Sequence, residues 1–104
     1  MGRWWDDKTV VSGVGLSRNQ QKRMDTIFDA NRSAIVNSYK AFLKAQDHLA
    51  ALNKSANPDQ SEVFSAIDGV NQARSDLEKA ASAMLLQIRK EMTPDQIDKL
   101  EKLQ

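Results

Sequence analysis

The sequence contains no cysteine among its 104 residues. Disulfide bridges, zinc-thiolate sites and thiol catalysis are therefore excluded together. A single histidine, His48, is the only imidazole available to a metal or to acid-base catalysis. The formal net charge of +1 is too small to require nucleic acid or an anionic membrane as a partner.

Long apolar runs are also lacking. No segment approaches the roughly 20 consecutive apolar residues of a membrane span, and no secretory signal is recognisable. The chain has only two prolines and four glycines, which leaves two long stretches almost free of strong helix breakers. We therefore expect one all-helical domain over residues 1–104, with any signal peptide or membrane anchor lying outside this sequence.

The clearest pattern is a stripe of residues spaced by alternating steps of four and three, which is the period of one helix face. No proline interrupts this stretch, and Gly69 is its only glycine. The pattern predicts a long helix over residues 59–91. Its stripe consists of Val63, Ile67, Val70, Arg74, Leu77, Ala81, Met84 and Ile88.

A second stripe lies upstream and predicts another long helix over residues 16–56. Short polar side chains near residues 31–33 compete for backbone groups and favour a kink there. Pro58 disfavours helix at the preceding residue and suits the first turn of the next helix, so the two helices form an antiparallel hairpin. The upstream stripe consists of Met24, Phe28, Asn31, Ile35, Ser38, Phe42, Ala45, Leu49 and Leu52.

Residues 1–15 are predicted to be a lead-in segment that docks on the rest of the chain. Trp4 and Trp5 are the only tryptophans, and together they carry a large apolar area that a folded chain rarely leaves bare. We expect them to pack as a lid on the helices or across a subunit boundary. Anchoring at a membrane interface is the alternative.

Two capping boxes of similar sequence flank the hairpin. In each box a hydroxyl accepts from the amide three residues on, and a glutamine side chain reaches back to the amide of the capping residue. The second box predicts a C-terminal helix over residues 93–104, with Pro94 in its first turn. The boxes read Leu16-Ser17-Arg18-Asn19-Gln20 and Met92-Thr93-Pro94-Asp95-Gln96.

Placed around a helical hairpin, this pair of boxes resembles the LTxxQ motif of the Spy/CpxP family of bacterial periplasmic proteins. Methionine replaces leucine in the second copy. The tryptophan-rich lead-in is also similar to the related heavy-metal-resistance sensors of the same fold. The motif residues, for which the resemblance implies a structural role, are Leu16, Ser17, Gln20, Met92, Thr93 and Gln96.

The resemblance implies an all-α, hooked arrangement of four helices in which the long antiparallel hairpin carries short N- and C-terminal helices. It further implies an interlocked homodimer in the periplasm. The expected function is ATP-independent holding of unfolded clients, or control of an envelope-stress sensor through a partner protein. A metal-sensing domain of the same fold and a dedicated protein-interaction module are the alternatives.

A holding protein needs exposed apolar surface with a charged border rather than catalytic residues. Such a surface is predicted beside the main stripe of the first long helix, and these residues are the candidate binding site for a client or partner. The alternative is that this second stripe forms the dimer interface. The candidate residues are Val36, Tyr39 and Leu43, flanked by Arg32, Lys40 and Lys44.

No residues are assigned to catalysis, metal or cofactor binding. His48 lacks a second imidazole at helical spacing, so we expect it to be solvated on a helix face. The chain contains no Glu-x-x-His pair, no nucleophile elbow and no phosphate-binding glycine loop. The sequence therefore predicts a protein that is not an enzyme.

Overall fold

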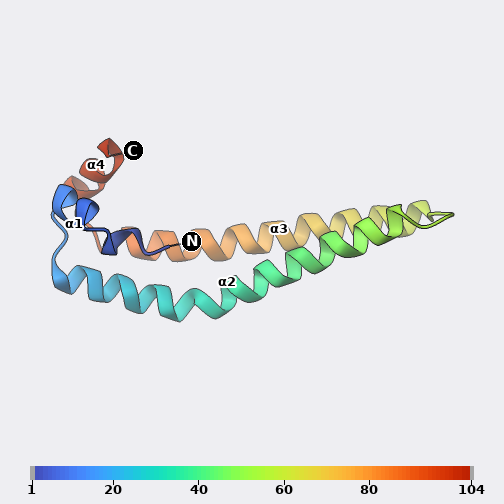
Figure 1. Ribbon diagram of the computed structural model, residues 1–104, viewed down its shortest axis with the longest axis horizontal. Helices are drawn as coiled ribbons and strands as arrows, with labels where there is room; N and C mark the ends of the chain where they lie inside the picture. The colour runs from blue at the N-terminus through green and yellow to red at the C-terminus, as the bar shows by residue number, and fades with distance from the viewer. Residues whose placement is uncertain (1, 104) are drawn as a thin grey trace. The chain divides into compact units, whose positions relative to one another are not determined.

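The computed structural model describes residues 2–103, and every regular element in that range is helical (Figure 1). This confirms the predicted all-α fold, with two long helices that pack together and short helices toward the termini. No helix in the described range combines the length and apolarity that crossing a membrane requires. The elements are a 3-10 turn η1 (Trp4–Asp6), α1 (Lys8–Val14), α2 (Arg18–Asn53), α3 (Gln60–Arg89) and α4 (Pro94–Lys102).

The long helices begin and end inside the ranges expected from the sequence, which were 16–56 and 59–91. The backbone stays α-helical through residues 31–33, where polar side chains favoured a kink. Asn31 donates from Nδ2 to the carbonyl oxygen of Ile27 at 2.7 Å, so its side chain bonds within the helix without interrupting it.

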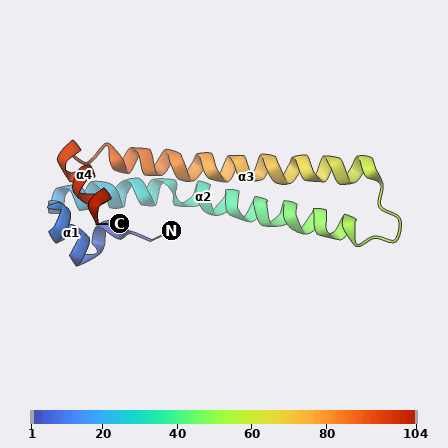
Figure 2. The same ribbon diagram turned by 90° about the horizontal axis from the view of Figure 1, so that it is seen from above.

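The chain divides into two compact units. The terminal unit comprises residues 2–32 and 83–103 of the described range, and the turn unit comprises residues 33–82. Within each unit, α2 and α3 run side by side in opposite directions (Figures 1 and 2).

The terminal unit holds the fully buried core. Trp5 is only 1 % exposed, and its ring meets that of Phe28 edge-on at 5.9 Å between centroids. Its indole Nε1 donates to the Asp25 carboxylate at 2.7 Å, so the polar atom of this large side chain is satisfied. Trp5 therefore packs against α2, as predicted for the lead-in. The largest fully buried side chains are Trp5, Val14, Met24, Met84 and Ile88.

Helices α1 and α4 pack together in the terminal unit (Figure 2). Asp7 caps α1 by accepting from the Thr9 amide at 2.8 Å, and Gly15 ends it with a left-handed φ of 80°. A Cβ atom at Gly13 would lie 3.2 Å from Leu103 Cδ1. The absence of a side chain at this position therefore lets Leu103 approach α1 closely.

The turn unit has a much thinner core. Only Ala66 and Val70 are buried within residues 33–82, whereas the large side chains of the α2 stripe are half-buried. Two positions of the predicted α3 stripe were wrong here, because Ile67 is 39 % exposed and Arg74 is also exposed, whereas Val63, Val70 and Leu77 are buried or half-buried as expected. Ala66 faces α2 in place of Ile67. Steps of three then four and steps of four then three give the same heptad spacing, so periodicity alone does not distinguish Ala66 from Ile67.

We predict that Gly69→Ala raises the free energy of unfolding by about 1 kcal/mol, since glycine is unfavourable inside a helix. A Cβ at Gly69 would meet nothing within 4 Å. Urea unfolding followed by circular dichroism measures the change. Gly13→Ala is the matched control, because the contact with Leu103 should reduce its gain. A destabilised Gly69→Ala variant would show that the site is more crowded than the structure indicates.

Candidate functional site

The two capping boxes meet in the terminal unit and form a polar clasp. Gln20 donates from Nε2 to Gln96 Oε1 at 2.7 Å, and Gln96 donates from Nε2 to Gln20 Oε1 at 3.0 Å. Each Nε2 also reaches a backbone carbonyl oxygen of the opposite segment. Gln20 donates to Glu91 and Gln96 donates to Gly15, both at 2.9 Å.

Each glutamine closes its own box as well. The amide of Ser17 donates to Gln20 Oε1 at 2.9 Å, and the amide of Thr93 donates to Gln96 Oε1 at 3.0 Å. Both side-chain oxygens thus accept two hydrogen bonds, and both side-chain nitrogens donate two. This is the full hydrogen-bonding capacity of a primary amide, so both side chains are saturated and the two glutamines make matching sets of bonds.

Apolar and charged contacts accompany the clasp. Leu16 and Met92, the first residue of each box, are both 7 % exposed. Arg23 Nε and a Glu91 carboxylate oxygen lie 2.7 Å apart and pair the helices beside the clasp. The motif residues therefore fix how the terminal segments meet α2 and α3. Their side chains are engaged in holding the fold.

The turn unit presents the candidate binding surface. Val36, Tyr39 and Leu43 are 40 %, 51 % and 40 % exposed, and each follows a half-buried stripe residue of α2 by one position. On α3, Phe64 is 57 % and Ile67 is 39 % exposed, and each follows a less exposed stripe residue by one position. We call these five residues the apolar face.

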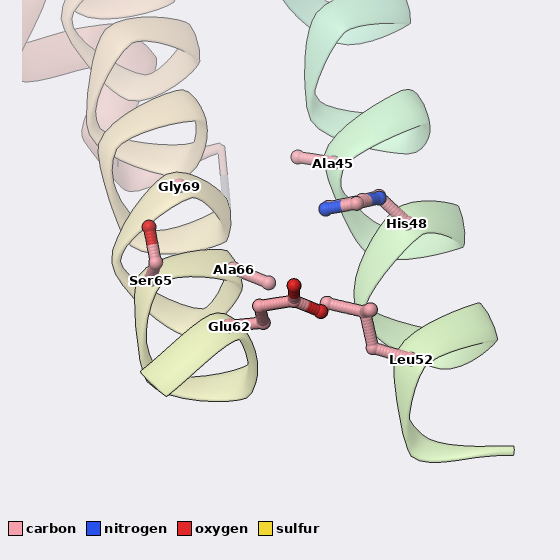
Figure 3. Close-up of a pocket in the computed structure, with 7 residues that line it drawn as sticks. All are labelled: Ala45, His48, Leu52, Glu62, Ser65, Ala66 and Gly69. Atoms are coloured by element: carbon pink, nitrogen blue, oxygen red, sulfur yellow. The ribbon is translucent and has the colours of Figure 1, made fainter. Parts of the chain in front are cut away.

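The opposite side of the turn unit carries a groove. His48, Glu62 and Gly69 each precede a stripe residue by one position, and all three line one groove of about 480 Å³ (Figure 3). In an antiparallel helix pair, positions of equal phase on the two helices lie on the same side. Residues that follow the stripe, which include the apolar face, therefore share the side away from the groove.

Charges of the turn unit are left without ion pairs. No salt bridge forms within residues 33–82, whereas the terminal unit contains several. Arg74 and Glu78 are both exposed, and both follow the stripe by one position. The Arg74 guanidinium lies 5.4 Å from the centroid of the Phe42 ring, and its NH1 donates to Asn71. The side of the turn unit that carries the apolar face therefore also carries one cation and one anion that form no ion pair.

The groove does not supply a complete metal site. The ring of His48 and the carboxylate of Glu62 both point into the space between the helices (Figure 3). A structural zinc ion takes about four protein ligands, and a catalytic one about three. Within the described range, no cluster of three or more histidine, cysteine or acidic side chains is suitably placed. His48 and Glu62 provide two donors.

The predicted binding residues are all exposed, but they fall in different units. Arg32 is the last α2 residue of the terminal unit, and the other five lie in the turn unit. Sequence reasoning missed Phe64 and Ile67. Phe64 is the only aromatic residue of α3 and lies outside the predicted stripe, so it could have been recognised. Ile67 was assigned to the stripe itself. The predicted set was Arg32, Val36, Tyr39, Lys40, Leu43 and Lys44.

The protein is thus a small all-helical protein built on an antiparallel helix pair. Its terminal segments are joined through two matched capping boxes. Residues 10–99 match the family described as heavy-metal resistance. The match covers most of the chain, which therefore belongs to the heavy-metal-resistance family. Neither the curated proteins nor the solved structures contain a match to this chain.

We predict that Gln20→Ala lowers the free energy of unfolding by about 2–4 kcal/mol, because it leaves the Ser17 amide and the Glu91 carbonyl without these partners and removes two of the four hydrogen bonds of the Gln96 side chain. Gln96→Ala should have a similar effect. In the double variant the losses should fall short of their sum by about 0.5–3 kcal/mol.

Urea unfolding of the two single variants and the double variant measures this coupling. Gln46→Ala, on the exposed surface of α2, is the control and should change little. Strictly additive losses would show that the two glutamines act independently.

Proposed function

We propose that this member of the heavy-metal-resistance family is a protein-binding module. In this proposal it acts in the periplasm and holds unfolded or partner protein without nucleotide and without catalysis, as the likeness to Spy/CpxP proteins suggests. The family match supports the class of protein. The apolar face supports the mode of action.

The exposure of the turn unit is the observation that carries the proposal. Its two helices leave five large apolar side chains between 39 % and 57 % exposed, and all belong to one side. Burial of apolar area contributes roughly 25 cal/mol per Å², so a partner segment that covered this face would gain substantial free energy. Isolated exposed leucines are normal, but an apolar group spanning two helices indicates an interaction surface.

The border of the face suits reversible capture. Lys40 lies on α2, and Asp68 and Glu78 lie on α3, all exposed to solvent. These charges keep the complex hydrated while apolar segments of a client are covered. Binding by apolar contact also needs no single fixed sequence in the client, which is what holding diverse unfolded chains requires.

We predict that the protein suppresses aggregation of insulin whose disulfides are reduced with dithiothreitol, in the absence of nucleotide. The chain has no cysteine, so the reductant acts on the client alone. Light scattering measures aggregation. Replacing Tyr39 and Leu43 together by serine should weaken suppression several-fold, because it removes two anchors from the centre of the apolar face.

Leu86→Ser is the matched control, since Leu86 is 60 % exposed and lies in the terminal unit. This variant should hold the client as well as the unmodified protein does. Circular dichroism checks that each variant keeps its helix content. Unchanged aggregation with a stoichiometric excess of the protein would overturn the proposed function.

A metal-responsive domain is the second candidate function. The family description and the joint position of His48 and Glu62 in the groove favour it. In that case, zinc, nickel or copper should bind with micromolar affinity by calorimetry, and His48→Ala should remove the binding. Asp47→Asn provides the control beside it. No micromolar heat of binding for any of the three ions would eliminate this candidate.

A further inference from the structure

We infer that the terminal unit contains a second binding site, which takes a protein segment with a basic residue two positions before a tryptophan. Residues 2–6, which we call the N-terminal strap, occupy this site at rest. The strap therefore competes with such a segment from another protein. The inference goes beyond the proposed function, because it concerns the other unit and a defined class of ligand and does not depend on the apolar face.

The strap is held to α2 by a small set of polar contacts. The Asp25 carboxylate accepts from the Trp5 indole Nε1 at 2.7 Å, and the Arg3 guanidinium lies 3.5 Å from the same oxygen. Gln21 donates from Nε2 to the Trp5 carbonyl oxygen at 2.9 Å. Arg3 also pairs with Asp6 inside the strap at 3.2 Å. Every one of these contacts can be made by a separate peptide that carries the same groups.

An aromatic ring is recognised at the same place. The ring of Trp5 meets that of Phe28 edge-on at 5.9 Å between centroids and is almost completely buried. Gln21, Asp25 and Phe28 follow one another at intervals of four and three, so they lie on one side of α2. This side of the helix supplies an amide for a peptide carbonyl, a carboxylate for an indole N–H and a cation, and an aromatic wall for the ring.

Release of the strap leaves the rest of the terminal unit attached. The clasp joins Gln20 to Gln96 and includes no strap residue. Asp7 lies outside the strap and caps α1 with its own carboxylate, so the first turn of α1 does not depend on η1. η1 is a single 3-10 turn without a side-chain cap, and so short an element has little stability of its own. The strap can therefore leave its site while α1 stays in place.

Charge favours a basic segment as the competitor. Asp25 is half-buried, and Arg3 is the only cation of the described range that pairs with it. When the strap leaves, this carboxylate loses its cation and its indole donor together. A segment that brings both groups replaces both contacts, whereas an acidic or purely apolar segment leaves the carboxylate without a charged partner.

Fluorescence anisotropy with a labelled glycine–serine peptide that contains one Arg-Ala-Trp sequence tests the inference. The tethered strap has a high effective concentration at its site, so Trp5→Ala, which vacates the site, should tighten peptide binding by more than about tenfold. Arg3→Ala weakens the strap but leaves the site intact, and should tighten binding about two- to fivefold. Lys8→Ala removes an exposed cation outside the strap and is the matched control, which should bind the peptide as the unmodified protein does.

Changes in the peptide and in Asp25 test the class of ligand. In the Trp5→Ala protein, a peptide with serine for tryptophan should not bind, and a peptide with glutamate for arginine should bind several-fold more weakly. Adding Asp25→Asn should weaken binding of the original peptide several-fold and remove its advantage over the glutamate peptide. Adding Asp29→Asn instead is the control, because Asp29 is an exposed acidic residue one turn further along α2.

The outcomes distinguish this inference from the proposed function. Circular dichroism checks helix content, and if Trp5→Ala loses it, Arg3→Ala carries the test, because Arg3 is an exposed residue outside the buried core. Variants that stay folded but bind the peptide no better than the unmodified protein would overturn the inference and leave the proposed function in place. Equal binding of the arginine and glutamate peptides would also overturn it. Peptide binding that depends on Asp25, in a protein that does not suppress insulin aggregation, would support the second site and overturn the proposed function.

Discussion

Two helices lying side by side can bury only one stripe of each, and this constraint explains most of the molecule. A third layer is needed to cover any apolar residue outside the stripes. The terminal unit has that layer over part of its helices, because the lead-in, α1 and α4 pack there, although Leu86 is still 60 % exposed. The turn unit consists of α2, α3 and their connection alone, so Tyr39 and Phe64 remain more than half exposed.

The terminal unit gains its third layer through the clasp as well as through burial. Short helices such as α1 and α4 are marginal in isolation and depend on tertiary contacts. Gln20 and Gln96 hold the segments that lead into α2 and α4, while Trp5 closes over Phe28. Stability is thereby concentrated in one unit, which leaves the other free to present surface.

Sequence reasoning reached the elements that local physics determines. The α2 stripe from Met24 to Leu52 is the less exposed side of that helix, and both capping boxes form the hydrogen bonds that their residue types predict. The bonds between Gln20 and Gln96 were beyond reach. They join residues far apart in the chain, and nothing local shows that two caps will meet.

The buried stripe of α3 shows a second limit of prediction from the sequence. Ile67 was expected to be buried because it is large and apolar, but the structure buries Ala66 there. Small residues let the helices approach, and the larger side chain is left on the outside. Surplus apolar surface was recognisable in the sequence at Val36, Tyr39 and Leu43. Its extension onto Ile67 of α3 was not, because the pattern had placed that residue in the buried stripe.

The positions of the aromatic chromophores give the terminal unit its own optical signal. Trp4 and Trp5 lie in η1 of the terminal unit, and Tyr39, the only tyrosine, lies on the apolar face of the turn unit. Tryptophan fluorescence can be excited at wavelengths where tyrosine does not absorb. It therefore reports whether η1 is packed in the terminal unit. The state of the terminal unit can therefore be watched by itself without any added dye.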